Sequence, residues 1–327
     1  MKVCLIVVFN HKFERNLEKL DKMYEGRFTN IYYLMPFYAG DREDVIPVYD
    51  SSFQFQGFFA QGSAIFCKEK FDYYFTVADD IVLRKEINEN NFLEYFQIKE
   101  GESFIDSLKM LSRFNKWGSV DYIGRYYNTW LAFHKAREVN FKGEIPERNE
   151  AIKRAKKYGF TENDCLMSIG ALLNIHNGRM TFEHGIRNII KDCTKEFLTR
   201  WSFIMTHMSH LMRVLRKKED FGFPVFCGWS DILIIYGPSM KEFCHLCGVF
   251  AAQRIFAEIA IPTAMVQTCS SVIVNPQNDL FLGTLTHKQL EKINQEYNYD
   301  LNMLLDNWPS ELLYLHPFKL SQWHYEV

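Results

Sequence analysis

The chain has 327 residues, of which 47% are hydrophobic and 16% aromatic, and its formal net charge is −2. A chain this apolar is not intrinsically disordered, because it has enough hydrophobic side chains to build a sizeable core. The near-neutral charge argues against a protein that binds nucleic acid through bulk electrostatic attraction. The length is that of one large domain or of two closely packed ones.

The cysteines and the N-terminal segment favour a cytoplasmic location. The eight cysteines are scattered along a chain that is large enough to fold without disulfides, so we expect reduced thiols. The first apolar run, 3–9, is shorter than that of a signal peptide and is followed at once by polar residues. The sequence has no stretch of about 18 apolar residues that would cross a membrane as a helix.

The first part of the chain alternates between strand and helix patterns. Strands are expected at 3–9, 30–35 and 71–78, and helices at 15–24 and 57–66. This alternation predicts a mostly parallel sheet that is covered on both faces. Ligands bind such sheets at the carboxyl ends of the strands, and Asn10 and the pair Asp79-Asp80 both follow strand ends. We therefore expect these three side chains at one edge of the sheet.

The rest of the chain changes character twice. The stretch 84–220 has few strand patterns and is predicted to be a helix-rich insertion, with helices at 91–97, 147–158 and 192–218. Strand character returns at 223–236, and the segments that follow are a long helix at 241–259 ended by Pro262 and short strands at 264–266 and 271–274. We therefore divide the chain into 1–83, 84–220 and 221–327, with the last part completing the domain that the first begins.

The pair Asp79-Asp80 is the clearest chemical signal in the sequence. Adjacent carboxylates repel each other, so a pair at a sheet edge is stabilised by a cation. Mg²⁺ and Mn²⁺ prefer oxygen ligands and often bind through one or two carboxylates together with substrate phosphates. A solvated turn that carries two acids is the alternative. The signatures of dinucleotide-binding proteins, P-loop enzymes, serine hydrolases and HExxH zinc enzymes are absent from the sequence.

The C-terminal segment adds a second chemical signal, because His316, Lys319 and Trp323 lie within eight residues. An imidazole can complete a Mn²⁺ shell, an ammonium can neutralise a phosphate, and an indole can form a pocket wall. Each of these residues alone is more often structural. Together with the acid pair, they suggest a site for a divalent cation and a diphosphate.

Three stretches resemble the GT-A-fold, nucleotide-sugar-dependent glycosyltransferases that bacteria use to build surface polysaccharide. They are Phe9-Asn10-His11 after the first strand, the strand 71–78 that leads into Asp79-Asp80, and His316-x-x-Lys319. The resemblance implies a GT-A-like (Rossmann-like) α/β fold, with a mostly parallel sheet and a helix-rich insertion, and a Mn²⁺ or Mg²⁺ cofactor. Ala78 stands where the family's D-x-D motif has its first acid, so the motif reads Ala-Asp-Asp here.

The resemblance also implies roles for the matching residues. Asp80 and His316 would bind the metal, and Asp79 would contact the ribose or a metal-bound water. Lys319 would close over the diphosphate. Phe9 and Asn10 would belong to the nucleotide-binding half of the domain.

The segment 53–62 lies where GT-A enzymes often contact the base or the ribose. Gln56 and Gln61 would hydrogen-bond the nucleotide there, and Phe58 would face the cleft. Ordinary helix packing is the alternative for this segment. On the acceptor side, Trp229 would stack on a sugar face and Asp231 would bind a hydroxyl, and Trp323 would also line the cleft.

Two acids are candidates for the carboxylate nearest the reaction, Asp231 and Glu258. Glu258 lies on an otherwise apolar predicted helix, and a buried carboxylate is costly unless it is paired or functional. An ion pair with Arg254, four residues earlier on the same helix face, is the alternative.

The expected reaction is the transfer of a sugar, most simply a hexose from a UDP-sugar, to a hydroxyl of a glycan or lipid-linked glycan in polysaccharide or lipopolysaccharide synthesis. The His-x-x-Lys closure slightly favours a retaining over an inverting mechanism. Two alternatives stay open. One is a sugar nucleotidyltransferase, although Asn10-His11-Lys12-Phe13 makes a poor phosphate loop. The other is a non-catalytic carbohydrate-binding or scaffold protein of envelope assembly.

Two further segments have both an ordinary and a functional interpretation. The segment 195–218 combines apolar residues with a basic end, which fits a core helix, a peripheral contact with anionic lipid at the inner face of the membrane, or a homodimer contact. Cys244 and Cys247 have the spacing of half a zinc site, but no second pair follows at the required spacing. We expect both thiols to lie in the core.

Overall fold

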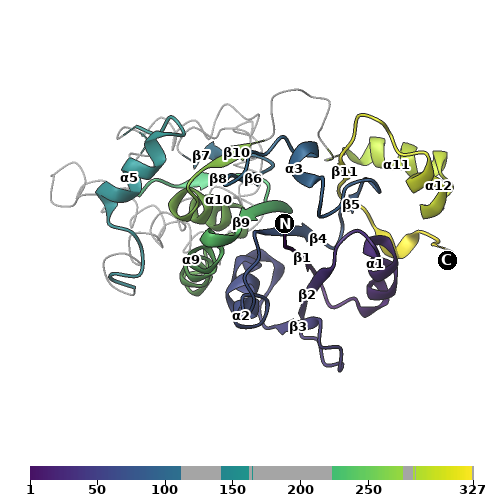
Figure 1. Cartoon of the computed structure of the whole chain (residues 1–327), viewed down its shortest axis with the longest axis horizontal. Helices are drawn as coiled ribbons and strands as arrows, with labels where there is room; N and C mark the ends of the chain where they lie inside the picture. The colour runs from purple at the N-terminus through teal and green to yellow at the C-terminus, as the bar shows by residue number, and fades with distance from the viewer. Residues whose placement is uncertain (112–140, 162–163, 165–222, 275–282, 284, 326–327) are drawn as a thin grey trace, which may run out of the picture. The chain divides into compact units, whose positions relative to one another are not determined.

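The computed structural model describes residues 1–111, 141–161, 164, 223–274, 283 and 285–325. The chain forms two compact units (Figure 1). The first consists of Met1–Leu108 and Phe226–Val327, and the second of Lys109–Val225. The stretch 84–108, which we had assigned to the insertion, contains a strand of the first unit's central sheet, so the second unit begins later than the sequence indicated.

The first unit is built on a seven-stranded sheet with the order β10-β6-β9-β4-β1-β2-β3. The strands are β1 (Val3–Val8), β2 (Asn30–Pro36), β3 (Val45–Val48), β4 (Tyr73–Ala78), β6 (Ser103–Ile105), β9 (Ile232–Tyr236) and β10 (Val272–Val274). Neighbouring strands are parallel except at β9, which runs antiparallel to both β4 and β6. The predicted α/β class with a mostly parallel sheet is confirmed, and the arrangement is compatible with a Rossmann-like fold.

The central strands are apolar on both faces, as strands covered by helices on both sides must be. Every residue of β1 and of β4 is buried. Leu5 and Phe75 belong to a large core cluster that also includes residues of α1 (Leu17–Tyr24), α11 (His287–Glu296) and α12 (Leu301–Asp306). The opposite face is covered by α2 (Gln56–Phe66) and α9 (Met240–Ala252), and in Figure 1 these two helices lie across the sheet from α1.

The helices α2 and α9 approach each other closely because small residues face each other at their crossing. A Cβ atom at Gly57 would lie 3.0 Å from the Cβ of Ala251, and one at Gly248 would lie 3.0 Å from the Cβ of Ala60. Larger side chains at the two glycines would therefore force the helices apart. This crossing fixes the position of α2 on the sheet, and with it the position of the residues at the N-terminal end of α2.

The predicted long helix at 241–259 is wrong, because the chain forms two helices there, α9 and α10 (Ala257–Thr268). Arg254 lies between them with a φ of +56°, a left-handed conformation that breaks the helix. Pro262 lies inside α10 and does not end it, so the predicted strand at 264–266 is also wrong. Proline has no N–H for the carbonyl of Glu258, and this carbonyl instead accepts a hydrogen bond of 2.9 Å from Gly228.

Several shorter elements complete the described parts of the first unit. They are β5 (Val82–Leu83), β8 (Phe226–Cys227), β11 (Tyr314–Leu315), α3 (Phe92–Tyr95) and the short 3₁₀ helices η1 (Glu14–Asn16), η2 (Ser52–Gln54), η7 (Gly237–Ser239) and η9 (Leu320–Gln322). The strands β5 and β11 form a separate antiparallel pair. This pair attaches the C-terminal segment to the chain just after β4.

The described part of the second unit contains β7 (Lys109–Met110) and α5 (Arg148–Lys156). The helix α5 confirms the helix that we predicted around 147–158. The segment 195–218, for which we considered a lipid or dimer contact, lies outside the described residues. Among the helices that the structure describes, none combines the length and the apolar character needed to cross a bilayer.

Candidate functional site

The carboxyl ends of β1 and β4 bring Asn10 and the acid pair together, as predicted. The backbone N–H of Asn10 donates a hydrogen bond of 3.0 Å to Asp79 Oδ1, and the N–H of Asp79 donates one of 2.9 Å to the carbonyl of Val8. These two bonds fix the position of the Asp79 side chain at the sheet edge. Asp80 is the next residue, and there the chain leads away from β4.

Asp231 reaches the same edge because β9 runs in the opposite direction to β4. A strand that is antiparallel to its neighbour begins where the neighbour ends, and Asp231 is the residue directly before β9. Its carbonyl accepts a hydrogen bond of 2.8 Å from the N–H of Ala78. The reversed strand therefore adds a third carboxylate to the edge where β4 delivers two.

The pairing of β11 with β5 places His316 close to the acids. This pairing aligns Leu315 with Val82, and the N–H of Phe318 donates a hydrogen bond of 2.7 Å to the carbonyl of Asp80. As a result, His316 Nε2 lies 3.7 Å from Asp80 Oδ2 and 3.9 Å from Asp231 Oδ2. We refer to Asp79, Asp80, Asp231 and His316 as the acid–histidine cluster.

Asp106 is a further acid at this edge that the sequence analysis missed. It follows β6, which runs parallel to β4 because both strands are antiparallel to β9. Only 5% of Asp106 is exposed, and its Oδ1 accepts a hydrogen bond of 2.8 Å from the hydroxyl of Tyr314. The signal was an acid after a strand, as at Asp79, but β6 is three residues long and we did not predict it.

The acids of the cluster all hold protons more readily than exposed acids do. Burial raises the pKa of Asp79 to about 7, against the opposing effect of the hydrogen bond from Asn10. Burial also raises the pKa values of Asp80 and Asp231, and the nearby imidazole of His316 opposes both increases. The charges of Asp80 and Asp106 raise the pKa of Asp231 further.

The cluster has the chemistry of a cation site, although its protein ligands are few. Asp80 Oδ1 is buried and has no hydrogen-bond partner in the described structure, and a cation would satisfy this atom and relieve the repulsion among the acids. Within the described residues, no three His, Cys, Asp or Glu side chains form a ready-made group that could hold a metal ion. A Mg²⁺ or Mn²⁺ ion would therefore complete its shell with water and with substrate phosphates.

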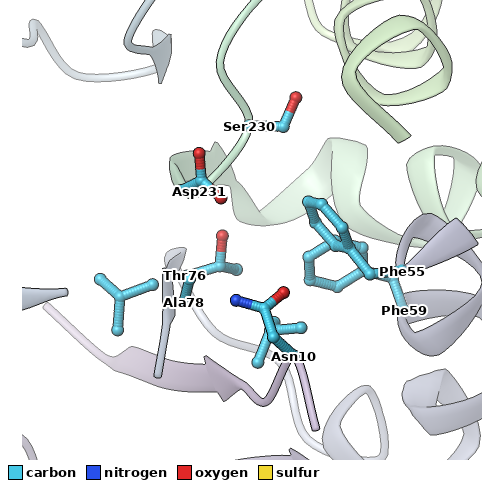
Figure 2. A pocket seen from close by; sticks show the side chains of 9 residues that line it. Asn10, Phe55, Phe59, Thr76, Ala78, Ser230 and Asp231 are labelled. Carbon is cyan, nitrogen blue, oxygen red and sulfur yellow. The ribbon is translucent and has the colours of Figure 1, made fainter. Parts of the chain in front are cut away.

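A narrow pocket opens beside the cluster (Figure 2). It is lined by Val8, Asn10, Phe55, Phe59, Thr76, Val77, Ala78, Ser230 and Asp231. Figure 2 shows the rings of Phe55 and Phe59 on one side of the pocket and the carboxylate of Asp231 on the other, with Asn10 below them in this view. The side chains of Asp80 and Asp231 remain 31% and 23% exposed, so a ligand can reach both carboxylates.

Among the predicted nucleotide contacts, the aromatic side chains of Phe9 and Phe58 are buried in the core. Phe9 is fully buried and packs edge-on against Tyr33, with ring centroids 6.2 Å apart. Phe58, which we had expected to face the cleft, is also fully buried in the core. Lys319 is exposed and directly follows Phe318, whose N–H bonds to Asp80.

The two glutamines of α2 make protein contacts. Gln56 is fully buried and its Nε2 donates a hydrogen bond of 2.6 Å to the carbonyl of Ile255. The Oε1 of Gln61 accepts a hydrogen bond of 2.8 Å from the N–H of Tyr49 at the helix surface. These contacts fit the helix-packing interpretation of this segment.

The two tryptophans that we placed at the acceptor side have different environments. Trp229 is 46% exposed and directly precedes Ser230 and Asp231, which line the pocket. Its backbone N–H donates a hydrogen bond of 2.9 Å to Ser107 Oγ. Trp323 is only 2% exposed, and its ring packs on Phe318 with a centroid separation of 4.6 Å. Trp323 therefore supports the C-terminal segment from within the core, whereas Trp229 is accessible to a ligand.

Glu258 and Arg254 do not share a helix face, because the helix is interrupted between α9 and α10. Arg254 instead forms an ion pair with Asp50, at 2.6 Å. Glu258 lies in the first turn of α10, and its carbonyl holds the N–H of Gly228. Of the two candidate acids, Asp231 is the one that the fold brings to His316.

Comparison with protein-family models, with curated proteins and with solved structures returned no match to this chain.

Proposed function

We propose that the protein is a GT-A-type glycosyltransferase that uses a nucleotide-diphosphate sugar and a divalent cation to build a bacterial surface glycan. The observation that carries this proposal is the acid–histidine cluster. Three carboxylates and an imidazole from distant parts of the chain meet at the carboxyl edge of a mostly parallel sheet, where such sheets bind ligands. A solvated turn, the alternative interpretation of Asp79-Asp80, would not gather a third acid and a histidine around the pair.

Asp80 and His316 are the residues that would hold the cation. Bound there, Mn²⁺ or Mg²⁺ would neutralise negative charge on the donor diphosphate and on the leaving group. The 3.7 Å separation between His316 Nε2 and Asp80 Oδ2 is short enough for both atoms to serve one ion without rearrangement of the backbone. Lys319 lies in the same segment and would add a positive charge over the diphosphate.

Asp231 is the residue that would act on the acceptor. Its raised pKa makes its carboxylate a better proton acceptor than an exposed aspartate, as a general base for an acceptor hydroxyl must be. A carboxylate in this place would also stabilise positive charge on the sugar ring in the transition state. Asp79, held by the N–H of Asn10, would orient the ribose or a water molecule.

Trp229 is the residue that would bind the acceptor sugar. It is exposed next to Asp231, and an indole can stack on the apolar face of a sugar ring. Asn10, Phe55 and Phe59 line the pocket together with Asp231, and these three residues would contact the donor.

A thermal-shift panel tests the donor site directly. The full chain would be melted with UDP-, GDP-, CMP- and dTDP-sugars, each with and without Mn²⁺. We expect one donor class to raise the melting temperature only when Mn²⁺ is present, because a ligand at about 100 times its Kd stabilises the native state by about 2.7 kcal/mol. A panel in which no donor gives a Mn²⁺-dependent shift contradicts the proposal.

Two variants, one on either side of β4, test whether the Mn²⁺-dependent shift in melting temperature arises at the cluster. Asp80→Asn removes a proposed metal ligand, and we expect it to abolish the Mn²⁺-dependent shift. Asp72→Asn is the matched control, since Asp72 is an exposed acid at the opposite end of the same strand. It should leave the shift unchanged. Release of a nucleoside diphosphate from the donor, rather than consumption of a sugar phosphate, distinguishes a glycosyltransferase from a nucleotidyltransferase.

A further inference from the structure

An open groove of about 410 Å³ lies over the crossing of α2 and α9. It is lined by Asp50, Gly57, Ala60, Gln61, Gly248, Ala251, Ala252 and Arg254. Its volume is in the range of ligand-binding pockets, about 300–1,000 Å³. None of its lining residues belongs to the acid–histidine cluster or to the pocket beside it, so the groove is a separate feature of the first unit.

The floor of the groove has no side chain larger than a methyl group, because glycines and alanines of the two helices form it. A Cβ atom at Gly57 or at Gly248 would lie 3.0 Å from an alanine Cβ of the other helix, so the helices touch through backbone and methyl groups alone. Helices packed this closely make a rigid and flat floor. A floor of this kind accommodates a ring that lies parallel to it.

The rim of the groove is polar and carries no net charge. Arg254 Nη1 forms an ion pair with Asp50 Oδ1 at 2.6 Å, and these are the only ionic groups among the described residues that line the groove. Gln61 supplies a carboxamide, whose Oε1 accepts a hydrogen bond of 2.8 Å from the N–H of Tyr49. Its Nε2 lies 3.9 Å from the place of a Cβ at Gly57, which puts this donor over the floor.

The backbone of Arg254 is in a conformation that favours glycine. The helix α9 ends in a Schellman motif, in which the N–H of Arg254 bonds to the carbonyl of Ala251 at 2.8 Å and that of Ile255 to the carbonyl of Phe250 at 3.1 Å. The φ of +56° at Arg254 is left-handed, and glycine is the usual residue at this position of the motif. Strained residues of this kind cluster at functional sites. The Arg254 side chain is 68% exposed, so a ligand in the groove can reach it.

Two exposed aromatic rings stand next to the groove. Tyr49 directly precedes Asp50 and is 64% exposed, and its ring packs edge-on against that of Phe37, which is 58% exposed, with the centroids 5.9 Å apart. Phe37 is also held in a left-handed conformation, with a φ of +54°. An exposed aromatic ring beside a polar rim can stack on the apolar face of a sugar.

We propose that the groove over α2 and α9 is a binding site for a neutral hexose unit of an oligosaccharide. A sugar hydroxyl both donates and accepts hydrogen bonds, so neighbouring hydroxyls of one ring can donate to Asp50 and accept from Arg254 and Gln61. The ring of Tyr49 would stack on the sugar. A rim without net charge does not favour an ionic ligand, and an apolar segment would leave the polar groups of the rim without partners.

This site lies outside the proposed reaction, so its test needs no sugar transfer. Saturation-transfer difference NMR detects weak binding of oligosaccharides to the full chain. The probes are maltotetraose, cellotetraose, mannotetraose and galactotetraose, each without nucleotide or metal. We expect transfer from the protein to at least one of the four. Transfer to none of them overturns the proposal.

The variant Arg254→Gly tests the groove without endangering the fold, because glycine adopts the left-handed conformation freely. We expect it to weaken binding about tenfold, since hydrogen bonds to a charged group are lost. Arg15→Ala is the matched control, because Arg15 is an exposed arginine of η1 that does not line the groove. It should bind as the unmodified chain does. Undiminished binding in Arg254→Gly contradicts the proposal.

A further variant separates this groove from the proposed acceptor site. Trp229→Ala should leave oligosaccharide binding at the groove unchanged, whether or not the protein transfers sugars. Loss of binding in Trp229→Ala, together with full binding in Arg254→Gly, would place the sugar beside Asp231 and overturn the proposal. A groove that instead meets a second copy of the chain would give a dimer in sedimentation, which Arg254→Gly weakens, and no transfer to the oligosaccharides.

Discussion

The hydroxyl of Tyr314 donates a 2.8 Å hydrogen bond to Asp106 Oδ1, and this bond joins the end of β6 to the strand that leads into His316. Both residues are buried. The bond therefore helps to place His316 opposite Asp80 and Asp231. It also holds the charge of Asp106 where it raises the pKa of Asp231.

We expect Tyr314→Phe to lower the free energy of unfolding by about 1–3 kcal/mol, because it removes the donor from a buried carboxylate. Asp106→Asn should cost less, since the amide oxygen can still accept the bond from Tyr314. Urea denaturation of the two variants measures the difference. A larger loss in Asp106→Asn than in Tyr314→Phe would show that the charge of Asp106, rather than this bond, holds the segment.

The pH dependence of stability follows from the raised pKa of Asp79. An acid whose pKa is higher in the folded state contributes stability that is fully present below its ordinary pKa of 3.8 and is lost as the pH rises through about 7. Without divalent cations, we therefore expect the melting temperature to fall as the pH is raised from about 5 to about 8. Added Mn²⁺ should reduce this fall, because it favours the charged carboxylates.

The corresponding variant is Asp79→Asn, which keeps an acceptor for the N–H of Asn10 but cannot ionise. Its melting temperature should depend less on pH than that of the unmodified chain. Asp72→Asn should keep the full pH dependence, since this acid is exposed at the other end of β4. Equal slopes for all three proteins would mean that Asp79 does not titrate in this range.

Gly228 fixes the loop that carries Trp229 and Asp231. A Cβ atom at this position would lie 1.8 Å from the carbonyl oxygen of Ser107, so Gly228→Ala must displace backbone. We expect a loss of about 1–3 kcal/mol in stability and a strong loss of the proposed sugar transfer. Gly26→Ala is the control, because Gly26 has a φ of +69° but an added Cβ there would meet no atom within 4 Å.

Gly26→Ala should also be destabilising, by about 1–2 kcal/mol from backbone strain alone. It should leave the proposed sugar transfer unchanged, because Gly26 lies just after α1 and an added Cβ there would meet no atom within 4 Å. If both glycine variants reduced transfer equally, the loss would reflect general destabilisation and not the position of the 228–231 loop.

The sequence predicted those parts of the site that depend on local pattern. Alternating strands and helices imply a parallel sheet, and residues directly after such strands meet at one edge, which is why Asn10 and Asp79-Asp80 could be placed together. Asp231 was named through the resemblance to the acceptor side of GT-A enzymes. Its approach to Asp80 depends on the reversed direction of β9 between β4 and β6, a non-local pairing that no local pattern records.

Other features could not be predicted because competing interactions decide them. Pro262 was expected to end a helix, but Gly228 supplies the hydrogen bond that the proline cannot, so α10 continues through it. Asp106 was missed because three residues are too few for a strand pattern.

Trp229 and Trp323 allow a direct test of which residue binds the acceptor. The sequence analysis placed both tryptophans at the acceptor side, but Trp229 is exposed and Trp323 is buried. We expect Trp323→Ala to cost about 3–5 kcal/mol in stability, because it leaves a cavity against Phe318. Trp229→Ala should change stability by no more than about 0.5 kcal/mol.

In the proposed reaction, Trp229→Ala should raise the KM for the acceptor roughly fivefold, which corresponds to the loss of about 1 kcal/mol of stacking. The KM for the nucleotide-sugar should not change, because the proposal places Trp229 on the acceptor side of Asp231. Trp229→Phe keeps a flat ring and should recover part of the acceptor affinity. A rise in the donor KM alone would instead move Trp229 to the donor side of the pocket, and the acceptor would then have to approach Asp231 from the opposite side.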